Sequence, residues 1–585
     1  MGKGQGLVQR LVNSLMRRSV SHRPTPSPIP HPPSPISHRP LPILLCIWFL
    51  TMAVGLGNTA LWEPDEPRFA EATRQMFERG DFLTPWFNGR PRFEKPVLMY
   101  WLQAPVVAVL GTTETAFRIP SALAGLLTLF LVYRIGARLV NPNAGVIAAI
   151  ALATTFRFVL YARQGLTDVP VTALVTLAIW CFIAGNGVGN VDGRRGLVLA
   201  GWAATGCAAL MKGPVAIIGP LVWIIYARWT EGWPGVKRMR IIEGAMVAAA
   251  IALPWFVVMV ALHGRAFVDV ALGYEVVARY MSPDFPGRDR GFSYFWGVWL
   301  GDAAPWSLFF VTATVWALSR WSTLEDGTRR AVQLSIVWFL TVLLLFSVSS
   351  YKLPHYIIPA YPATALLVGV FADAVMRGAV SATWLWRVPS ALAAVLLIVG
   401  ATLLGLLLRR AFDLPVSDPS FVLVGILVVG AVAIVINLVL RRDQRVLTAL
   451  TAALVAGYAW TIIVISPREL RRFQPIPGLA RSAQQIAEAG EPLAVAGNYG
   501  APGLVFYARH EVEQLADRED LIRFLSEPGP RHCVLPLSDF EAVRSEVPQS
   551  WRIVDRGEVF SVRMRRLLEQ TPERAGRTLV LVTTK

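Results

Sequence analysis

The sequence has little charge, few cysteines and, before Glu63, no acidic residue at all. Only 16% of its 585 residues are charged, whereas soluble domains average about 25%. The four cysteines form no C-x-x-C pair, which argues against both a disulfide framework and a thiolate metal site. In contrast, 54% of the residues are hydrophobic and the mean hydropathy is +0.48. Together these values predict a polytopic α-helical membrane protein.

The net charge of +17 does not indicate nucleic-acid binding. The basic residues lie mostly in short loops between apolar runs, and no separate domain combines a basic patch with interleaved aromatics. We interpret them as orientation signals and contacts to lipid headgroups.

Residues 1–40 are basic and rich in proline, which favours an extended chain, so we expect a disordered cytoplasmic tail. The next apolar run lacks a clear small-residue cleavage site and is expected to be an uncleaved span. Hydropathy predicts about 13 spans within residues 41–466, several of them short. Their approximate ranges are 41–60, 116–138, 143–160, 167–185, 197–211, 214–229, 241–262, 296–319, 331–349, 355–376, 388–408, 420–440 and 446–466.

The apolar run Val97–Leu110 is too short for a span and suits an interfacial or re-entrant helix. If it does not cross and the tail is inside, every inner loop is basic, as the positive-inside rule requires. We therefore expect a multi-pass protein of the inner (plasma) membrane whose loop 61–115 faces the periplasm. Residues 467–585 are less hydropathic and alternate between strand-like and helix-like segments, which predicts a small extracytoplasmic α/β domain.

The loop at 61–96 concentrates the carboxylates that the preceding chain lacks. A helix is expected from Pro67 to Gly80, with an apolar face that would lie on the bilayer. Asp65 and Glu66 precede it, where the positive end of a helix keeps a carboxylate ionised and able to act as a general base. The alternative is that either residue only caps the helix. Farther along, Arg92, Glu94 and Lys95 adjoin the short apolar run, where the cations would contact lipid phosphates or merely snorkel.

The motifs of this loop resemble a known family. The strings Pro64-Asp65-Glu66-Pro67-Arg68-Phe69-Ala70-Glu71, Gly80-Asp81, Asn88-Gly89 and Phe93-Glu94-Lys95-Pro96 are similar to those of the bacterial aminoarabinose transferases that modify lipid A. These enzymes belong to the GT-C glycosyltransferases, which include relatives of the protein O-mannosyltransferases. Further matches lie around Asp168 in "YARQGLTDVP", around Lys352 and Tyr356 in "SYKLPHYIIPAYP", and at Glu275-x-x-x-Arg279.

The resemblance implies a GT-C fold, a donor sugar linked to a polyprenyl phosphate such as undecaprenyl phosphate, and inverting catalysis on the outer face. Asp65, Asp168 and Glu66 are then the catalytic candidates. Arg68, Lys95, Lys352 and Tyr356 are candidates for binding the donor phosphate, and Glu94, Glu275 and Arg279 are further site candidates. For Asp168 and Tyr356, the alternatives are a helix cap and an aromatic of the membrane interface.

The sequence departs from the family at two points. Phe69 stands where the family often has tyrosine, and Tyr274 and Val276 flank Glu275 where the family often has histidine. The resemblance leaves a divalent metal open, but no ligand set for it follows from these residues. The two stray histidines, His263 and His355, are assigned no ligand role, and the sequence requires no cofactor.

The acceptor stays open between a lipid A-like lipid, another envelope glycan, and Ser or Thr residues of exported proteins. A transporter is a weaker alternative, because transporters place ionisable residues near the midplane and show internal repeats. Here the charges gather at one face. A structural membrane protein would need no such cluster of carboxylates.

Overall fold

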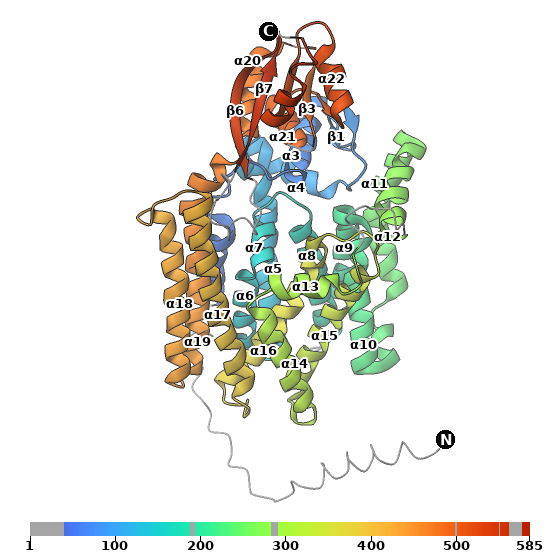
Figure 1. The fold of residues 1–585 in the computed structure, drawn as a ribbon. Helices are drawn as coiled ribbons and strands as arrows, with labels where there is room; N and C mark the ends of the chain where they lie inside the picture. The colour runs from blue at the N-terminus through green and yellow to red at the C-terminus, as the bar shows by residue number, and fades with distance from the viewer. Residues whose placement is uncertain are drawn as a thin grey trace, which may run out of the picture. The chain divides into compact units, whose positions relative to one another are not determined.

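A computed structural model describes residues 40–187, 194–281, 290–488, 490–497, 500–548, 550–560 and 576–585. The expected disordered tail lies outside these residues, apart from Pro40. The described chain forms a bundle of membrane helices and a C-terminal sheet domain that packs on one end of the bundle (Figure 1).

The helices before the C-terminal domain run in chain order from α2 to α19. Their bounds are α2 Pro40–Trp48, α3 Asp65–Arg79, α4 Leu98–Leu110, α5 Glu114–Leu139, α6 Pro142–Ala153, α7 Phe156–Ala162, α8 Asp168–Gly185, α9 Arg195–Lys212, α10 Ile218–Lys237, α11 Ile241–Val268, α12 Arg279–Met281, α13 Tyr294–Asp302, α14 Trp306–Ser319, α15 Asp326–Ser347, α16 Tyr361–Met376, α17 Trp384–Leu406, α18 Val422–Val439 and α19 Asp443–Trp460.

The polytopic helical fold is confirmed, but the number of spans differs from the expected one. Within the described residues, 9 helices are long and apolar enough to cross a membrane, or up to 11 if the bent pairs α6–α7 and α13–α14 each count as one span. The expected spans 197–211 and 214–229 lie in one continuous helical stretch, Arg195–Lys237. The expected span 41–60 is helical only over Pro40–Ala53, which is short for a bilayer core.

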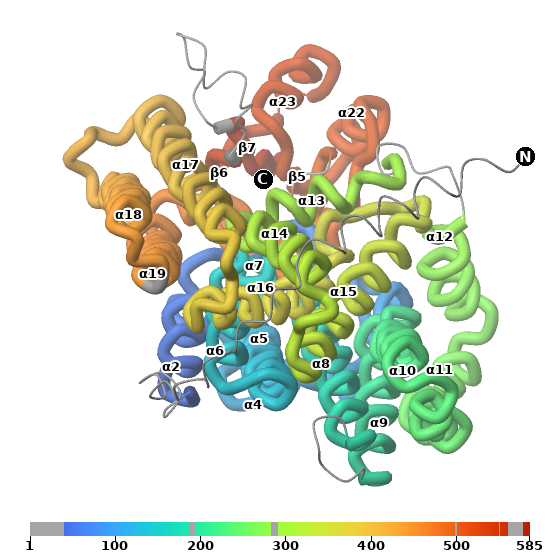
Figure 2. Tube along the Cα trace, turned by 90° about the horizontal axis from the view of Figure 1, so that it is seen from below, coloured from blue at the N-terminus to red at the C-terminus, as the bar shows by residue number. Residues whose placement is uncertain are grey.

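Burial separates the helices into a central group and a lipid-facing group. In the stretch Pro354–Met376, which contains α16, an 18-residue apolar window is 100% buried, whereas only 17% of such a window is buried in the stretch containing α11. The helices α17, α18 and α19 stand together at one side of the bundle (Figure 2). In the centre, a Cβ on Gly369 of α16 would lie 2.4 Å from the Ala144 carbonyl oxygen of α6, so glycine permits the close approach of these helices.

The loop at residues 61–115 contains the helices α3 and α4, with the two-stranded hairpin β1 (Trp86–Phe87) and β2 (Arg90–Pro91) between them. Helix α4 has 13 residues, or about 20 Å, which is too short for a bilayer core. Helix α3 ends at Gly80 in the left-handed conformation (φ 66°), as the sequence predicts. The expectation that its apolar face lies on the bilayer is wrong, because Phe69 and Met76 are buried against Met99 and Tyr100 of α4.

The C-terminal domain is a mixed five-stranded sheet in the order β4-β3-β5-β7-β6, in which β4, β3 and β5 are parallel and β7 and β6 are antiparallel. Along β3, Leu493 and Val495 face α20 and α21, while Ala494 and Ala496 face α22 and α23. Burial on both faces explains the continuous apolar strands. The bounds are β3 Leu493–Ala496, β4 Val512–Leu515, β5 His532–Pro536, β6 Arg552–Phe560, β7 Gly576–Thr583, α20 Ile476–Ile486, α21 Ala501–Ala508, α22 Arg518–Ser526 and α23 Leu537–Val543.

Candidate active site

A buried ion pair between Glu66 and Arg118 fastens the start of α3 to α5. Arg118 donates to the two carboxylate oxygens at 2.9 and 2.7 Å, and also to backbone carbonyls within residues 56–60. The same oxygens accept the backbone N–H groups of Trp62 and Gly165 at 2.7 and 2.6 Å. Since each oxygen already accepts two donors, the geometry favours a positioning role for Glu66 over proton transfer.

The neighbouring Asp65 has a half-exposed carboxylate. Its Oδ1 lies 3.6 Å from Nη1 of Arg68, and Asp65 is itself the first residue of α3. The residue at the N-cap is Pro64, which forms no capping bond, so the alternative that Asp65 serves only as a cap gains no support. Asp65 lies close enough to Tyr161 and His355 to interact with both electrostatically.

Asp168, the first residue of α8, is buried in a polar centre built by four elements. Its Oδ1 lies 2.5 Å from Nζ of Lys212 in α9 and 4.0 Å from Nε2 of His355. The other nitrogen of that imidazole lies 3.0 Å from the hydroxyl of Tyr161 in α7. Lys212 also lies over the ring of Tyr356, 5.6 Å from its centroid. The N-cap of α8 is Thr167, so Asp168 is held by an ion pair, not by a capping bond.

A second cluster joins the loop before α4 to the helical stretch after α11. Nζ of Lys95 lies 2.5 Å from one oxygen of Glu275, and Nη2 of Arg279 lies 2.6 Å from the other. Burial lowers the pKa of Lys95, and the negative charge of Glu275 opposes that shift. Lys95 also interacts electrostatically with Lys212 and Asp168, so the two clusters are neighbours.

Lys352 is buried, and its ammonium donates to the carbonyl of Ser349 at 2.5 Å. The hydroxyl of Ser349 and the backbone N–H of Tyr351 both bond to the carbonyl of Arg279, at 3.2 and 3.0 Å. The segment that carries Lys352 therefore runs beside the Lys95–Glu275–Arg279 cluster. Among the described residues, no carboxylate lies within ion-pair distance of the Lys352 ammonium.

Glu94 belongs to neither cluster. Its Oε2 lies 3.6 Å from Nε of Arg92, and its side chain is half-exposed. Arg92 in turn stacks over the ring of Phe69 at 4.5 Å, so the phenylalanine that replaces the family's tyrosine acts as a cation–π partner.

The stray His263 pairs with the hydroxyl of Thr84 at 2.9 Å. No three metal-ligating side chains converge in the part of the chain that the structure describes.

The C-terminal domain contacts the loop at residues 61–115 directly. The side chain of Asn88 bonds to both the N–H and the carbonyl of Val512 at 2.8 Å, which covers the edge strand β4. Glu63, two residues before Asp65, accepts the N–H of Gly503 at 2.7 Å. Although Glu63 as a whole keeps exposed surface, desolvation of its carboxyl group raises its pKa to about 7.

The sequence missed several residues that the fold brings into the site. Lys212 and Arg118 sit within long apolar stretches, and His355 was assigned no role. The sequence did contain a signal for Lys212 and Arg118. Each is an isolated charge, and an ionisable residue in a membrane helix marks a functional or paired position. Of the predicted residues, Asp168, Lys95, Glu275, Arg279 and Tyr356 gather in one neighbourhood. Asp65 lies at its edge with a half-exposed side chain, and Arg68 and Glu94 are similarly exposed.

Comparison with known proteins finds similar membrane glycosyltransferases. Residues 94–258 match the family model described as dolichyl-phosphate-mannose-protein mannosyltransferase. The chain is 27% identical over 340 residues to the undecaprenyl phosphate-alpha-4-amino-4-deoxy-L-arabinose arabinosyl transferase of Edwardsiella ictaluri. It is 31% identical over 342 residues to the enzyme of the same name from Pseudomonas paraeruginosa. Each match covers 56% of this chain, and the matched part spans 59% and 58% of the two relatives.

The fold matches over a longer range. The crystal structure of ArnT from Cupriavidus metallidurans bound to undecaprenyl phosphate superimposes with a TM-score of 0.71, covering 93% of this chain and 97% of that one at 21% identity. At this identity the likeness establishes the fold. Together, the sequence relatives and the fold confirm the resemblance that the sequence motifs indicated.

Proposed function

We propose that this chain, related by sequence and fold to the GT-C glycosyltransferases, moves a sugar from a polyprenyl-phosphate-linked donor to a cell-envelope acceptor on the outer face of the membrane. The single observation that carries the proposal is the neighbourhood of Lys95, Arg279 and Lys212. These three cations share the two carboxylates of Glu275 and Asp168. The cluster keeps a positive charge that matches a phosphate group.

The donor phosphate would bind to Lys95 and Arg279, with Lys352 and Tyr356 beside them. As the bond between the sugar C1 and the phosphate oxygen breaks, the polyprenyl phosphate leaves with the electron pair. The cations stabilise the charge that grows on it. Glu275 holds Lys95 and Arg279 in place for that role.

Asp65 is the group that meets the acceptor, because its carboxylate is half-exposed while Glu66 is saturated. For a hydroxyl acceptor, Asp65 takes the proton as the acceptor oxygen bonds to C1 from the opposite face, which inverts the configuration. For a phosphate acceptor no proton needs to be removed, and Asp65 acts by orientation. Asp168 is neutralised by Lys212 and positions the sugar or that lysine.

The decisive experiment supplies the purified protein, in nanodiscs with an envelope lipid extract, with radiolabelled sugars on undecaprenyl phosphate. Label transferred to a lipid or glycan, and lost in Asp65→Asn, would support the proposal. No transfer from any polyprenyl-phosphate sugar in the presence of envelope lipids and proteins would contradict it. Impermeant thiol labelling of cysteines placed at positions 65 and 238 tests the face, since only the first should react in intact cells.

A second candidate is transfer to Ser or Thr of exported proteins. The observation that favours it is the family model over residues 94–258, whose description names a protein mannosyltransferase. The same radiolabel experiment separates the two, because label in protein rather than lipid would select this alternative.

A further inference from the structure

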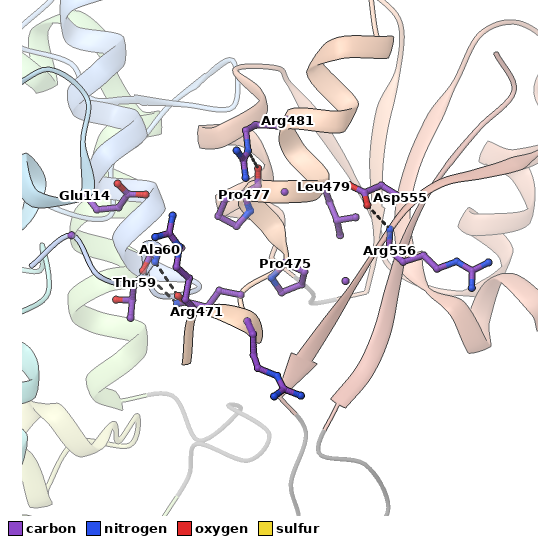
Figure 3. Close-up of a pocket in the computed structure, with 15 residues that line it drawn as sticks. Thr59, Ala60, Glu114, Arg471, Pro475, Pro477, Leu479, Arg481, Asp555 and Arg556 are labelled. Carbon is purple, nitrogen blue, oxygen red and sulfur yellow. Dashed lines mark hydrogen bonds between the residues drawn. The ribbon is translucent and has the colours of Figure 1, made fainter. Parts of the chain in front are cut away.

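The imidazole of His355 and the carboxylate of Asp168 lie close to each other without bonding directly. Their nearest atoms, Nε2 and Oδ1, are 4.0 Å apart, which is too long for a hydrogen bond. Both side chains keep accessible surface, 16% for the imidazole and 7% for the carboxylate, so a small polar group can reach them. We call this space the His355–Asp168 gap. It is separate from the pocket of about 350 Å³ beside the C-terminal domain, because neither residue lines that pocket (Figure 3).

The His355 side of the gap offers a hydrogen-bond donor. Nδ1 of the imidazole lies 3.0 Å from the hydroxyl of Tyr161. The same hydroxyl lies beside the guanidinium of Arg157, which can only donate. Tyr161 therefore accepts from Arg157 with its oxygen and donates its proton to Nδ1, which leaves the imidazole proton on Nε2. Asp302 accepts two bonds from Arg157, one of them at 2.9 Å, and so holds the guanidinium in place.

The Asp168 side of the gap offers an acceptor with unused capacity. Among the described residues, its carboxylate accepts one side-chain hydrogen bond, at 2.5 Å from Nζ of Lys212. An ionised carboxylate can accept about four. An oxygen placed about 2.9 Å from both Nε2 and Oδ1 would accept from His355 and donate to Asp168. A hydroxyl group does both at once, whereas an ammonium group only donates and a C–H group does neither.

The gap lies between the groups that would hold the two ends of the reaction. Asp168 interacts electrostatically with Lys212 and Lys95, which belong to the cationic neighbourhood proposed for the donor phosphate. His355 interacts electrostatically with Asp65, the group proposed to meet the acceptor. The sugar carbon that is attacked lies between the leaving phosphate and the acceptor. The hydroxyl groups of the same sugar are therefore within reach of the gap.

We infer that His355 and Asp168 together bind one hydroxyl group of the transferred sugar. The chain therefore selects a donor sugar that carries a neutral hydroxyl at this position over one that carries a hydrogen or an amino group. This inference rests on the proposed function and adds His355 as a residue that determines sugar specificity. Tyr161 is a positioning residue, since it acts through the imidazole.

The first test measures donor binding without an acceptor. Asp65→Asn protein in nanodiscs is titrated with undecaprenyl phosphate linked to mannose or to L-arabinose. It is also titrated with analogues of each donor in which one hydroxyl at a time is replaced by a hydrogen or by an amino group. At one position, we expect either replacement to weaken binding about 10- to 100-fold, because a hydrogen bond to a charged group is lost.

Four variants on the same background show which residue reads the hydroxyl. His355→Phe keeps an aromatic ring but removes Nε2, so it should abolish the loss of affinity at that position. His355→Gln carries an amide donor and should retain part of it. Tyr161→Phe frees Nδ1 and should reduce the loss without abolishing it. The matched control is His263→Phe, which also removes an imidazole paired with a hydroxyl, that of Thr84 at 2.9 Å, and should keep the full loss.

Three results would overturn the inference. The first is a donor series in which no single replacement weakens binding, which would show that water alone fills the gap. The second is the same loss of affinity in His355→Phe as in its parent. The third is an amino analogue that binds as tightly as the hydroxyl donor, which would show a site for a cation at Asp168. A melting curve for each variant shows that it is folded before it is scored.

The second test separates this inference from the proposed function. In the transfer assay, the wild type should prefer the hydroxyl donor over its deoxy analogue about 10- to 100-fold in kcat/KM. His355→Phe should lose this preference and leave the KM for the acceptor unchanged. Transfer without any such preference in the wild type would refute the inference alone. A binding preference that depends on His355, without transfer from any polyprenyl-phosphate sugar, would refute the proposed function and leave the sugar-binding site.

Discussion

Two buried ion-pair regions hold the loop at residues 61–115, one at Glu66 and one at Lys95, and they differ in how completely they are paired. At the start of α3, Glu66 and Arg118 satisfy each other and the surrounding backbone. Around Lys95, two cations share the single carboxylate of Glu275. A saturated pair can hold the loop but has no capacity left for a ligand, whereas the second region keeps charge for one. The first region is therefore suited to hold the loop, and the second fits the donor-phosphate site that we propose.

The largest expected effect is on stability in the saturated region. Glu66→Gln leaves the guanidinium of Arg118 buried without its paired carboxylate, which should cost about 3–5 kcal/mol. The melting temperature of the detergent-solubilised protein measures this loss. Glu94→Gln, which neutralises a half-exposed carboxylate in the same loop, should leave the melting temperature almost unchanged. Equal melting temperatures for wild type and Glu66→Gln would show that the pair does not hold the fold.

The next effect is on turnover. Asp65→Asn keeps the side-chain volume and removes the base and its charge, so turnover should drop by about 100-fold or more. The melting temperature should stay near that of the wild type, because the Asp65 carboxylate is half-exposed and its nearest cation, Arg68, lies at 3.6 Å. The two measurements together separate Asp65 from Glu66. Near-normal turnover in Asp65→Asn would remove Asp65 from the mechanism.

A smaller loss is expected in the cationic cluster. Lys95→Met and Lys352→Met should each lower turnover at saturating donor about 10- to 100-fold, because the charge on the leaving phosphate is then less well stabilised. Replacing either lysine by arginine keeps the positive charge but changes the shape of the cationic group. Turnover should therefore lie between that of the Met variant and that of the wild type. Arg138→Gln, on the expected inner face, is the control and should have no comparable effect. Wild-type turnover in both Met variants would move the proposed phosphate site elsewhere.

Much of this arrangement could be predicted from the sequence. The fold class, the helix ending at Gly80, the short helix before residue 111 and strands β3, β5 and β7 follow from local periodicity and turn residues. The partners of Asp168 and Lys95 could not be predicted, because Lys212 and Glu275 lie far away in the chain and only tertiary packing brings them together. The burial of α3 was missed for the same reason, since an apolar helix face does not show whether lipid or α4 covers it.

The smallest predicted effect concerns Glu63, which lies between the two regions and the C-terminal domain. Burial raises its pKa to about 7 from an ordinary 4.5. Below pH 4.5 the carboxyl group is protonated whether or not the domain is docked, so its contribution to stability is fully present there. As the pH rises through about 7 the docked form must ionise and that contribution is lost.

Glu63→Gln keeps an acceptor for the N–H of Gly503 and does not ionise. Between about pH 5.5 and about pH 8.5, the melting temperature of the wild type should therefore fall relative to that of Glu63→Gln. Parallel melting temperatures across this range would show that the Glu63 carboxyl group does not change its charge at the domain interface.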